Sequence, residues 1–179
     1  MTILKSTLLA AAATVAIASA AQAADPIMPT PVVPVAPAAS VFDWNGFYAG
    51  IRVGAENEID FDETDWLVGA EIGVNAAFDM FVLGGELAVD YVFDDPEFAY
   101  VEGTVRAGVL LMPEALVYGT VGYGADMDDG SGEHVLAGLG VEFAVAESVS
   151  VDGRYVYGWA QDGADSDIHK FTIGANFHF

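Results

Sequence analysis

Apolar and polar side chains alternate along most of the chain after Phe47, and a period of two is typical of a β-strand with two different faces. The alternation predicts eight strands. Their predicted ranges are 47–56, 66–78, 81–91, 99–111, 117–126, 135–145, 149–159 and 170–179. One face of each strand is rich in Val, Ile, Leu and aromatic residues, and the other carries Gly, Ala, Thr and the charged residues.

The connections between these strands alternate in length. Short turns are predicted around Asp79, Pro113 and Glu147. Longer, acidic connections are predicted at 57–64, 94–97, 127–132 and 161–167. Short turns on one rim and longer loops on the other are typical of outer-membrane β-barrels. Because the number of strands is even, both ends of the barrel are expected at the periplasmic rim.

The charged residues decide which face meets lipid. Four of the five basic residues fall on the polar face of the predicted strands, together with several acids. A basic residue facing lipid near the bilayer midplane would cost about 2–4 kcal/mol, whereas inside a barrel it can pair with a carboxylate. The predicted interior charge network consists of Arg52, Glu71, Glu86, Asp90, Glu102, Arg106, Glu142, Asp152, Arg154 and Lys170.

A soluble barrel of lipocalin type also alternates, but it turns its apolar face inward and covers its outside with polar side chains. The polar face of this chain is mostly small residues with a few charges, which would make a poor soluble exterior. The predicted fold is therefore an all-β, eight-stranded, antiparallel up-and-down transmembrane β-barrel.

Aromatic residues on the apolar face gather near the predicted strand ends, as in the two aromatic girdles of a membrane barrel. Those near the short turns are Phe47, Phe78, Phe81, Phe177 and Phe179. Those near the loops are Trp66, Tyr91, Tyr123, Tyr157 and Trp159. This sorting by height favours a membrane barrel over a β-sandwich core.

The segment before the barrel divides into two parts. Lys5 precedes an apolar stretch of about 14 residues, too short for a spanning helix, and Ala21-Gln22-Ala23 is a small-x-small cleavage pattern. Residues 1–23 are therefore predicted to be a signal peptide. Residues 24–43 hold five of the seven prolines and are predicted to be an extended periplasmic linker. Residues 44–179 are assigned to the barrel.

Composition narrows the function further. The chain is 54% hydrophobic, yet no segment after the signal peptide has 18 consecutive apolar residues, so no spanning helix is predicted. Cysteine is absent, so no disulfides are expected. The net charge of −22 argues against binding nucleic acid and favours cations.

The segment Phe42-Asp43-Trp44-Asn45-Gly46-Phe47-Tyr48-Ala49-Gly50, after a Pro- and Ala-rich linker, resembles the W-x-G-F/Y-Y-x-G opening of a known family. This is the alphaproteobacterial outer-membrane β-barrel family, the opacity-like surface antigens often called "porin family" proteins. The resemblance implies an outer-membrane location. The alternating end of the chain also resembles the terminal signal that the outer-membrane assembly machinery recognises. Its outward residues are Phe171, Ile173, Phe177 and Phe179.

An eight-stranded barrel is only wide enough for its own side chains, so we expect a non-enzymatic protein with a structural and surface role in the envelope. One alternative is a narrow, cation-preferring pore lined by the interior carboxylates. A less favoured alternative is a membrane enzyme at the outer rim that uses His134 or His169 with Asp126, Asp128 or Asp167.

No cofactor is predicted. The acidic run 126–133 misses the register of an EF-hand, with Gly130 at its fifth position, so no defined metal site is predicted either. The expected partners are outer-membrane lipid and lipopolysaccharide, the latter through shared divalent cations, and the outer-membrane assembly machinery.

Overall fold

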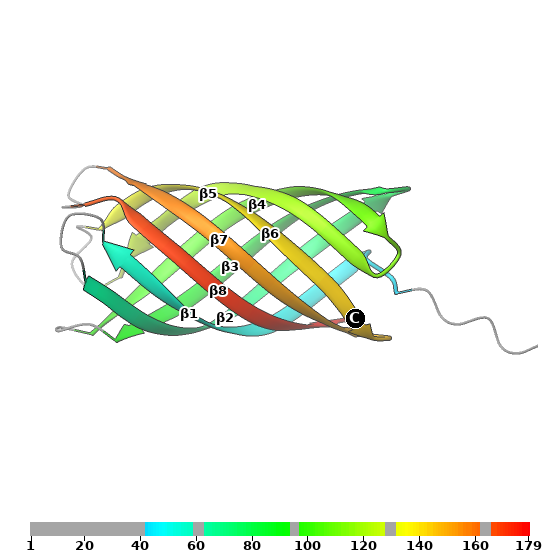
Figure 1. Ribbon diagram of the computed structural model, residues 1–179, viewed down its shortest axis with the longest axis horizontal. Coiled ribbons are helices and arrows are strands. Elements are labelled where there is room, and N and C mark those ends of the chain that lie inside the picture. Colours follow the sequence, from blue (N-terminus) through cyan, green and yellow to red (C-terminus); the bar gives the residue numbers. More distant parts are fainter. Residues whose placement is uncertain (1–41, 59–62, 94–96, 128–131, 162–165) are drawn as a thin grey trace, which may run out of the picture. The chain divides into compact units, whose positions relative to one another are not determined.

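The computed structural model describes residues 42–58, 63–93, 97–127, 132–161 and 166–179. The predicted signal peptide and most of the predicted linker lie outside the described residues. Eight antiparallel strands close into a barrel (Figure 1). They are β1 (Gly46–Glu58), β2 (Glu63–Phe78), β3 (Phe81–Phe93), β4 (Phe98–Met112), β5 (Ala115–Asp126), β6 (Glu133–Ala146), β7 (Val149–Ala160) and β8 (Ile168–His178).

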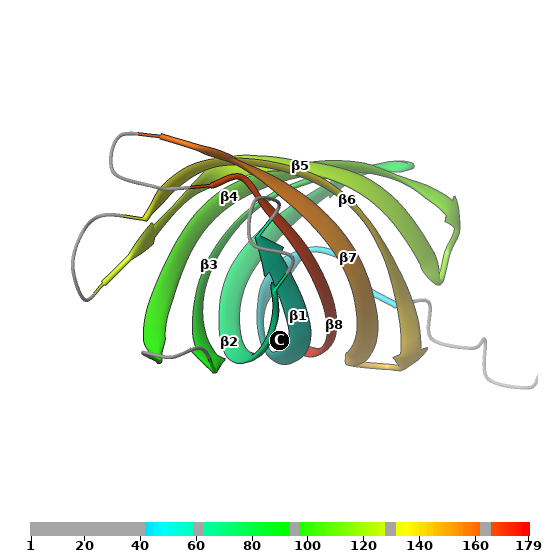
Figure 2. The same ribbon diagram turned by 60° about the vertical axis from the view of Figure 1, so that its left-hand side comes forward.

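Each strand pairs with the next in the chain, and β8 returns to pair with β1. In the closing seam Tyr48 lies opposite His178, and Arg52 lies opposite Gly174. The tilt of the strands around the barrel is visible in Figure 2. The predicted eight-stranded antiparallel barrel is therefore confirmed, and closure leaves no unpaired strand edge.

The strands extend further toward the loops than predicted. Asn57 and Thr64, both predicted to lie in a connection, are opposite each other in the β1–β2 ladder, and Asn57 Nδ2 donates a hydrogen bond to Thr64 Oγ1 at 3.3 Å. The backbones of Glu58 and Glu63 form the last pair. The predicted boundaries at 57–64 were wrong because polar residues end the hydrophobic alternation before the backbone ladder ends.

The short turns require particular residues. Asp79, in the turn between β2 and β3, has φ of 60°, a conformation that Asp adopts more readily than most residues. Gly46 begins β1 with φ of 108°, and a Cβ there would lie 3.0 Å from the carbonyl oxygen of Phe179. The glycine of the opening motif is thus needed where the first strand starts beside the last residue.

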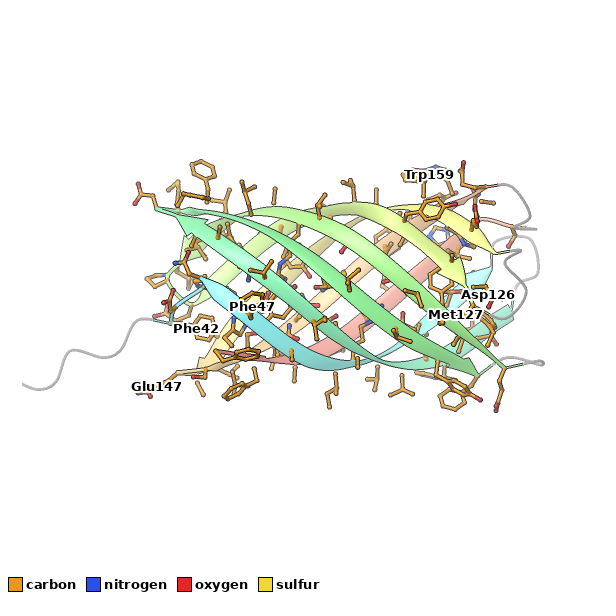
Figure 3. All side chains as sticks on the ribbon, turned by 180° about the vertical axis from the view of Figure 1, so that it is seen from behind. Phe42, Phe47, Asp126, Met127, Glu147 and Trp159 are labelled. Atoms are coloured by element: carbon orange, nitrogen blue, oxygen red, sulfur yellow. The ribbon has the colours of Figure 1, made fainter. Side chains whose placement is uncertain are left out.

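The outward face is apolar over its whole height. Between the aromatic positions at the two ends, the outward residues of the described strands include no Asp, Glu, Lys or Arg. In Figure 3, Phe42, Phe47 and Glu147 lie at the short-turn end, and Asp126, Met127 and Trp159 lie at the loop end. An apolar band bounded by aromatic residues is the surface of a barrel that spans a membrane.

Candidate functional site

The polar side chains of all eight strands meet inside the barrel, and the ten residues of the predicted charge network are all buried there. Eight of them form one connected set of ion pairs. Arg106 and Glu142 form a separate pair nearer the short turns. We call the larger set the central network. Its members are Arg52, Glu71, Glu86, Asp90, Glu102, Asp152, Arg154 and Lys170.

Arg52 of β1 anchors the loop side of the central network. Its Nε and Nη2 atoms lie 2.7 and 2.6 Å from the two carboxylate oxygens of Asp90. Nη2 also lies 2.7 Å from Glu102 Oε2. Lys170 of β8 pairs with the same two acids, at 3.0 Å from Asp90 Oδ2. Two cations and two carboxylates therefore neutralise one another across four strands.

Arg154 of β7 anchors the other side of the central network. Both of its terminal nitrogens bind Glu86, and the Nη2–Oε2 distance is 3.0 Å. Its Nε donates to the Tyr118 hydroxyl at 2.9 Å, and that hydroxyl donates to Asp152. Tyr48 donates its hydroxyl to Glu86 Oε2 at 2.6 Å. Tyr48 and Tyr118, from opposite sides of the barrel, thus supply the remaining hydrogen bonds to Arg154 and its acidic partners.

Glu71 lies between the two arginines. Its Oε2 is 3.4 Å from Arg52 Nη1 and 3.7 Å from Arg154 Nη2. Because Glu71 contacts both guanidinium groups, it joins the two halves of the network into one. Charged groups buried this fully remain ionised only when they are paired, which explains why so few residues outside this set carry charge in the interior.

The Arg106–Glu142 pair, at 2.9 Å, lies toward the short turns. Arg106 Nε also donates to Asn75 Oδ1 at 3.1 Å. Glu142 accepts a hydrogen bond from Ser150 Oγ at 2.5 Å, and Ser150 Oγ lies 3.0 Å from His178 Nε2. The Arg106 guanidinium stacks over the rings of Tyr48 and Tyr118, which separate this pair from the central network.

Apolar side chains flank the charged residues at both ends of the barrel. The short-turn cluster consists of Phe42, Trp44, Val82, Leu116 and Tyr118. The loop-side cluster consists of Leu67, Val92 and Tyr100, with Phe98 packed against it. Leu136, Val156 and Ile168 are buried on the strands across from the loop-side cluster. The ion pairs are thus flanked by apolar clusters toward both ends of the described barrel.

Phe42 belongs to this interior although it falls in the segment predicted to be linker. It is only 7% exposed and packs against Trp44, with ring centroids 4.7 Å apart. The barrel's packed unit therefore begins before residue 44. Phe42 belongs to the opening motif that follows the Pro- and Ala-rich run, but its burial depends on closure of the whole barrel.

Several interior residues were not among the predicted site residues. Glu56 is buried at the loop end, and it raises the interior count to seven carboxylates against four basic side chains among the described residues. Other interior residues with side-chain hydrogen bonds include Tyr48, Asn75, Tyr100, Tyr118, Thr120, His134, Ser150 and His178. All lie on the polar face, so the alternation alone could have identified them.

The two histidines considered for catalysis point to opposite faces of the barrel wall. His134 is buried inside, with Nδ1 3.1 Å from the Tyr100 hydroxyl and Nε2 3.1 Å from the Ser166 carbonyl. His169 faces outward, with Nδ1 2.6 Å from the Tyr155 hydroxyl. The two rings therefore do not converge on one site.

Asp167, their proposed carboxylate partner, accepts hydrogen bonds from the Tyr157 hydroxyl at 2.6 Å and from the Ala160 amide at 2.8 Å. These hydrogen bonds lower the pKa of Asp167 below its usual value, the Tyr157 hydroxyl contributing most. Asp126 lies at the end of β5, and Asp128 lies outside the described residues.

The residues of the predicted assembly signal, Phe171, Ile173, Phe177 and Phe179, all face outward and are exposed.

The described residues contain no group of three or more His, Asp or Glu side chains arranged to hold a metal ion. Part of the acidic run 126–133 lies outside the described residues. No helix among those described is long and apolar enough to cross a bilayer.

Comparison with known proteins identifies the fold. Neither a protein-family model nor a curated protein sequence matches the chain. Ail, the attachment invasion locus protein of Yersinia pestis, is 14% identical over 75% of this chain and 97% of its own, with a TM-score of 0.54. The N-terminal barrel domain of Pseudomonas aeruginosa OprF is 13% identical over 75% and 99%, with a TM-score of 0.52. The outer membrane enzyme PagL is 11% identical over 74% and 99%, with a TM-score of 0.52.

These proteins share the eight-stranded outer-membrane barrel fold with this chain. An apolar exterior of closed strands is one of only two ways in which a chain can cross a bilayer with its backbone hydrogen bonds satisfied. The fold and the lipid-facing exterior together assign the protein to the bacterial outer membrane.

Proposed function

We propose that the protein is a non-enzymatic structural component of the outer membrane, a filled barrel that occupies and stabilises the membrane and presents acidic loops at the surface. The observation that carries this proposal is the placement of the ion pairs between the short-turn cluster and the loop-side cluster. An eight-stranded barrel has an interior that its own side chains can fill, and here they fill it with paired charges.

The outer rim supports an interaction with lipopolysaccharide through divalent cations. Three outward tyrosines near the loops, Tyr91, Tyr123 and Tyr157, donate their hydroxyls to Glu97, Glu133 and Asp167. Each pair holds a carboxylate beside the aromatic positions at the loop end, where the lipid headgroups of the outer leaflet are expected. A carboxylate there repels a lipid phosphate unless a cation such as Mg²⁺ or Ca²⁺ lies between them, because such hard cations bind both kinds of oxygen.

We also propose that the protein belongs to the alphaproteobacterial opacity-like surface antigens. The opening motif supports this, because its residues have distinct structural roles: Trp44 packs inside the barrel, Gly46 starts β1 and Tyr48 binds Glu86. We propose that the outer-membrane assembly machinery recognises the outward residues at the end of the chain, Phe171, Ile173, Phe177 and Phe179.

A narrow cation-preferring pore is the second candidate. The interior surplus of carboxylates over basic side chains favours it, since excess negative charge attracts cations. The apolar clusters at both ends oppose it, because apolar side chains that line a narrow passage resist the entry of ions.

A catalytic role is not part of the proposal. PagL is an enzyme with a similar fold, so the fold alone does not decide the question. The local geometry argues against one site that uses both histidines, because His134 faces the interior and His169 faces outward.

Deletion and complementation in the native host test the structural role. Loss of the protein is expected to raise uptake of an apolar dye and sensitivity to detergent. The variants His134→Gln and His169→Gln are expected to restore the barrier as fully as the unchanged protein does. Failure of either variant to complement, despite normal amounts of folded barrel in the membrane, would point to an enzyme instead.

A further inference from the structure

The short-turn mouth of the barrel is covered by a segment that belongs to no strand. Residues 42–45, which we call the mouth segment, precede β1, yet Phe42 and Trp44 are only 7% and 3% exposed. Both rings pack inside the barrel against Val82 of β3 and Leu116 of β5. Side chains outside the sheet therefore form part of the short-turn cluster.

The mouth segment is attached to opposite sides of the barrel. Trp44 Nε1 donates to the carbonyl oxygen of Pro113 at 2.9 Å, in the turn between β4 and β5. In a ring of eight strands this turn lies across the barrel from β1. Next to β1, the Ala77 amide donates to Asn45 Oδ1 at 2.7 Å. The Phe42 ring lies 4.8 Å from the ring of His178 on β8. The segment thus spans the mouth.

A local turn fixes the shape of the mouth segment. The Asp43 carboxylate accepts hydrogen bonds from the backbone amide and the side-chain amide of Asn45, at 2.9 and 3.1 Å. The same bonds lower the pKa of Asp43. Asp43 and Asn45 are exposed while Phe42 and Trp44 are buried, so the polar side chains of the turn face solvent and its aromatic side chains face the barrel interior.

The Arg106–Glu142 pair and its neighbours lie directly behind the buried rings. His178, which touches both Phe42 and Trp44, lies 3.3 Å from Glu142. Ser150, between His178 and Glu142, is fully buried. The aromatic rings of the mouth segment therefore stand between this charged layer and the periplasmic side.

The strand ladders do not depend on the mouth segment. Every strand pair begins at Gly46 or later, and the closing pair of β1 with β8 includes none of residues 42–45. At the loop end, by contrast, the apolar cluster comes from the strands themselves. Of the two clusters, only the short-turn cluster has members outside the strands, Phe42 and Trp44, which can leave without breaking a strand pair.

We propose that the mouth segment is a removable plug, whose withdrawal opens the Arg106–Glu142 layer to periplasmic water while the barrel stays closed along its strands. The geometry behind this is the packing of Phe42 and Trp44 across the mouth and the Trp44–Pro113 hydrogen bond. The inference goes beyond the proposed structural role, because it makes one end of a filled barrel open and close.

Cysteine labelling tests the plug, since the chain contains no cysteine of its own. Ser150→Cys places one thiol behind the plug, and a small cationic methanethiosulfonate in detergent micelles is the probe. We expect the reporter to react slowly in the otherwise unchanged barrel and at least tenfold faster when Phe42→Ala and Trp44→Ala are added. The matched control is Phe47→Ala, which removes an aromatic ring of β1 from the outward face, close to the mouth segment in the chain, and should leave the rate unchanged.

Two additional variants make the test decisive. A second reporter, Val92→Cys in the loop-side cluster, should keep its slow rate when the plug is removed, because only one end opens. Trp44→Phe keeps an aromatic ring but loses the bond to Pro113, and should speed labelling at residue 150 about threefold. Equal rates with and without the plug in a barrel that keeps its heat-modifiable gel shift would overturn the proposal. So would loss of that shift in both plug variants, because the strands would then need the segment in order to close.

Discussion

Arg52 and Asp90 face each other inside the barrel as a two-point ion pair, with Nε–Oδ1 and Nη2–Oδ2 distances of 2.7 and 2.6 Å. The two residues are 38 positions apart and sit on β1 and β3, with β2 between them. Both side chains are almost fully buried. The pair shows how the interior is built: side chains reach past the neighbouring strand and meet near the axis.

Removing one partner of this pair is expected to destabilise the barrel strongly. Asp90→Asn leaves Arg52 and Lys170 with one carboxylate fewer, and breaking a buried pair in this way typically costs about 3–5 kcal/mol. Urea unfolding of the refolded protein measures the change in the free energy of unfolding. Asp79→Asn, at an exposed turn where Asn adopts the same backbone conformation, is the control and should change it by less than about 0.5 kcal/mol. Equal effects of the two substitutions would contradict a paired interior.

The direction of the apolar face can be tested with a single charge. Val105 lies at the middle of β4 and faces lipid, so Val105→Arg is expected to lower the free energy of unfolding by about 2–4 kcal/mol in lipid vesicles. Leu111→Arg, also outward but near the short-turn end of the same strand, should cost at most about 1 kcal/mol. A barrel with its apolar face inside would show no such dependence on height.

Glycines on the two faces should respond differently to the same substitution. At Gly140, which faces inward, a Cβ would lie 2.3 Å from the ring of Tyr118, whose hydroxyl is held by Arg154 and Asp152. Gly140→Ala should therefore cost about 1–3 kcal/mol through overpacking. At the outward Gly153 the nearest atom, from Val141, would be 3.9 Å away. Gly153→Ala should leave the free energy of unfolding unchanged or raise it by up to about 1 kcal/mol. The same unfolding titration distinguishes the two outcomes.

The Tyr157–Asp167 contact at the loop rim predicts a pH effect. The lowered pKa of Asp167 means that its contribution to stability is present above the usual Asp pKa and is lost as the pH falls through the lower folded value. Tyr157→Phe removes the largest cause, so the pKa of Asp167, followed by NMR of its carboxyl carbon, should rise toward the usual value. Tyr155→Phe, which removes the contact to His169 instead, should leave the Asp167 pKa unchanged. If neither substitution changes the pKa of Asp167, the hydrogen bond between Tyr157 and Asp167 is not formed.

The sequence predicted which residues face inward but not how they pair. Alternation assigned Arg52 and Asp90 to the polar face, because a strand side chain can point only to one face or the other. The height of each residue in the barrel depends on the register between strands, which closure of β1 onto β8 determines. For this reason the sharing of Glu71 between Arg52 and Arg154, and the tyrosine contacts to Glu86 and Asp152, could not be predicted.

The ends of the barrel were the hardest part to predict. Asn57 and Thr64 are polar and ended the predicted strands too early, although their backbones continue the ladder. Phe42 follows the Pro- and Ala-rich run and was predicted to be linker, yet it packs inside the barrel. In both cases the structure of these residues depends on contacts with residues far along the chain or across a loop. Local composition does not predict such contacts.

Single-channel conductance of the refolded protein, lacking residues 1–23, in a planar bilayer tests the central claim most directly. A heat-modifiable gel shift of the same sample shows that the barrel is folded. The account predicts the gel shift without steady conductance, because paired charges and two apolar clusters fill the interior. Steady cation-selective openings that weaken in Glu86→Gln or Glu102→Gln would contradict it and would make the interior carboxylates the lining of a pore.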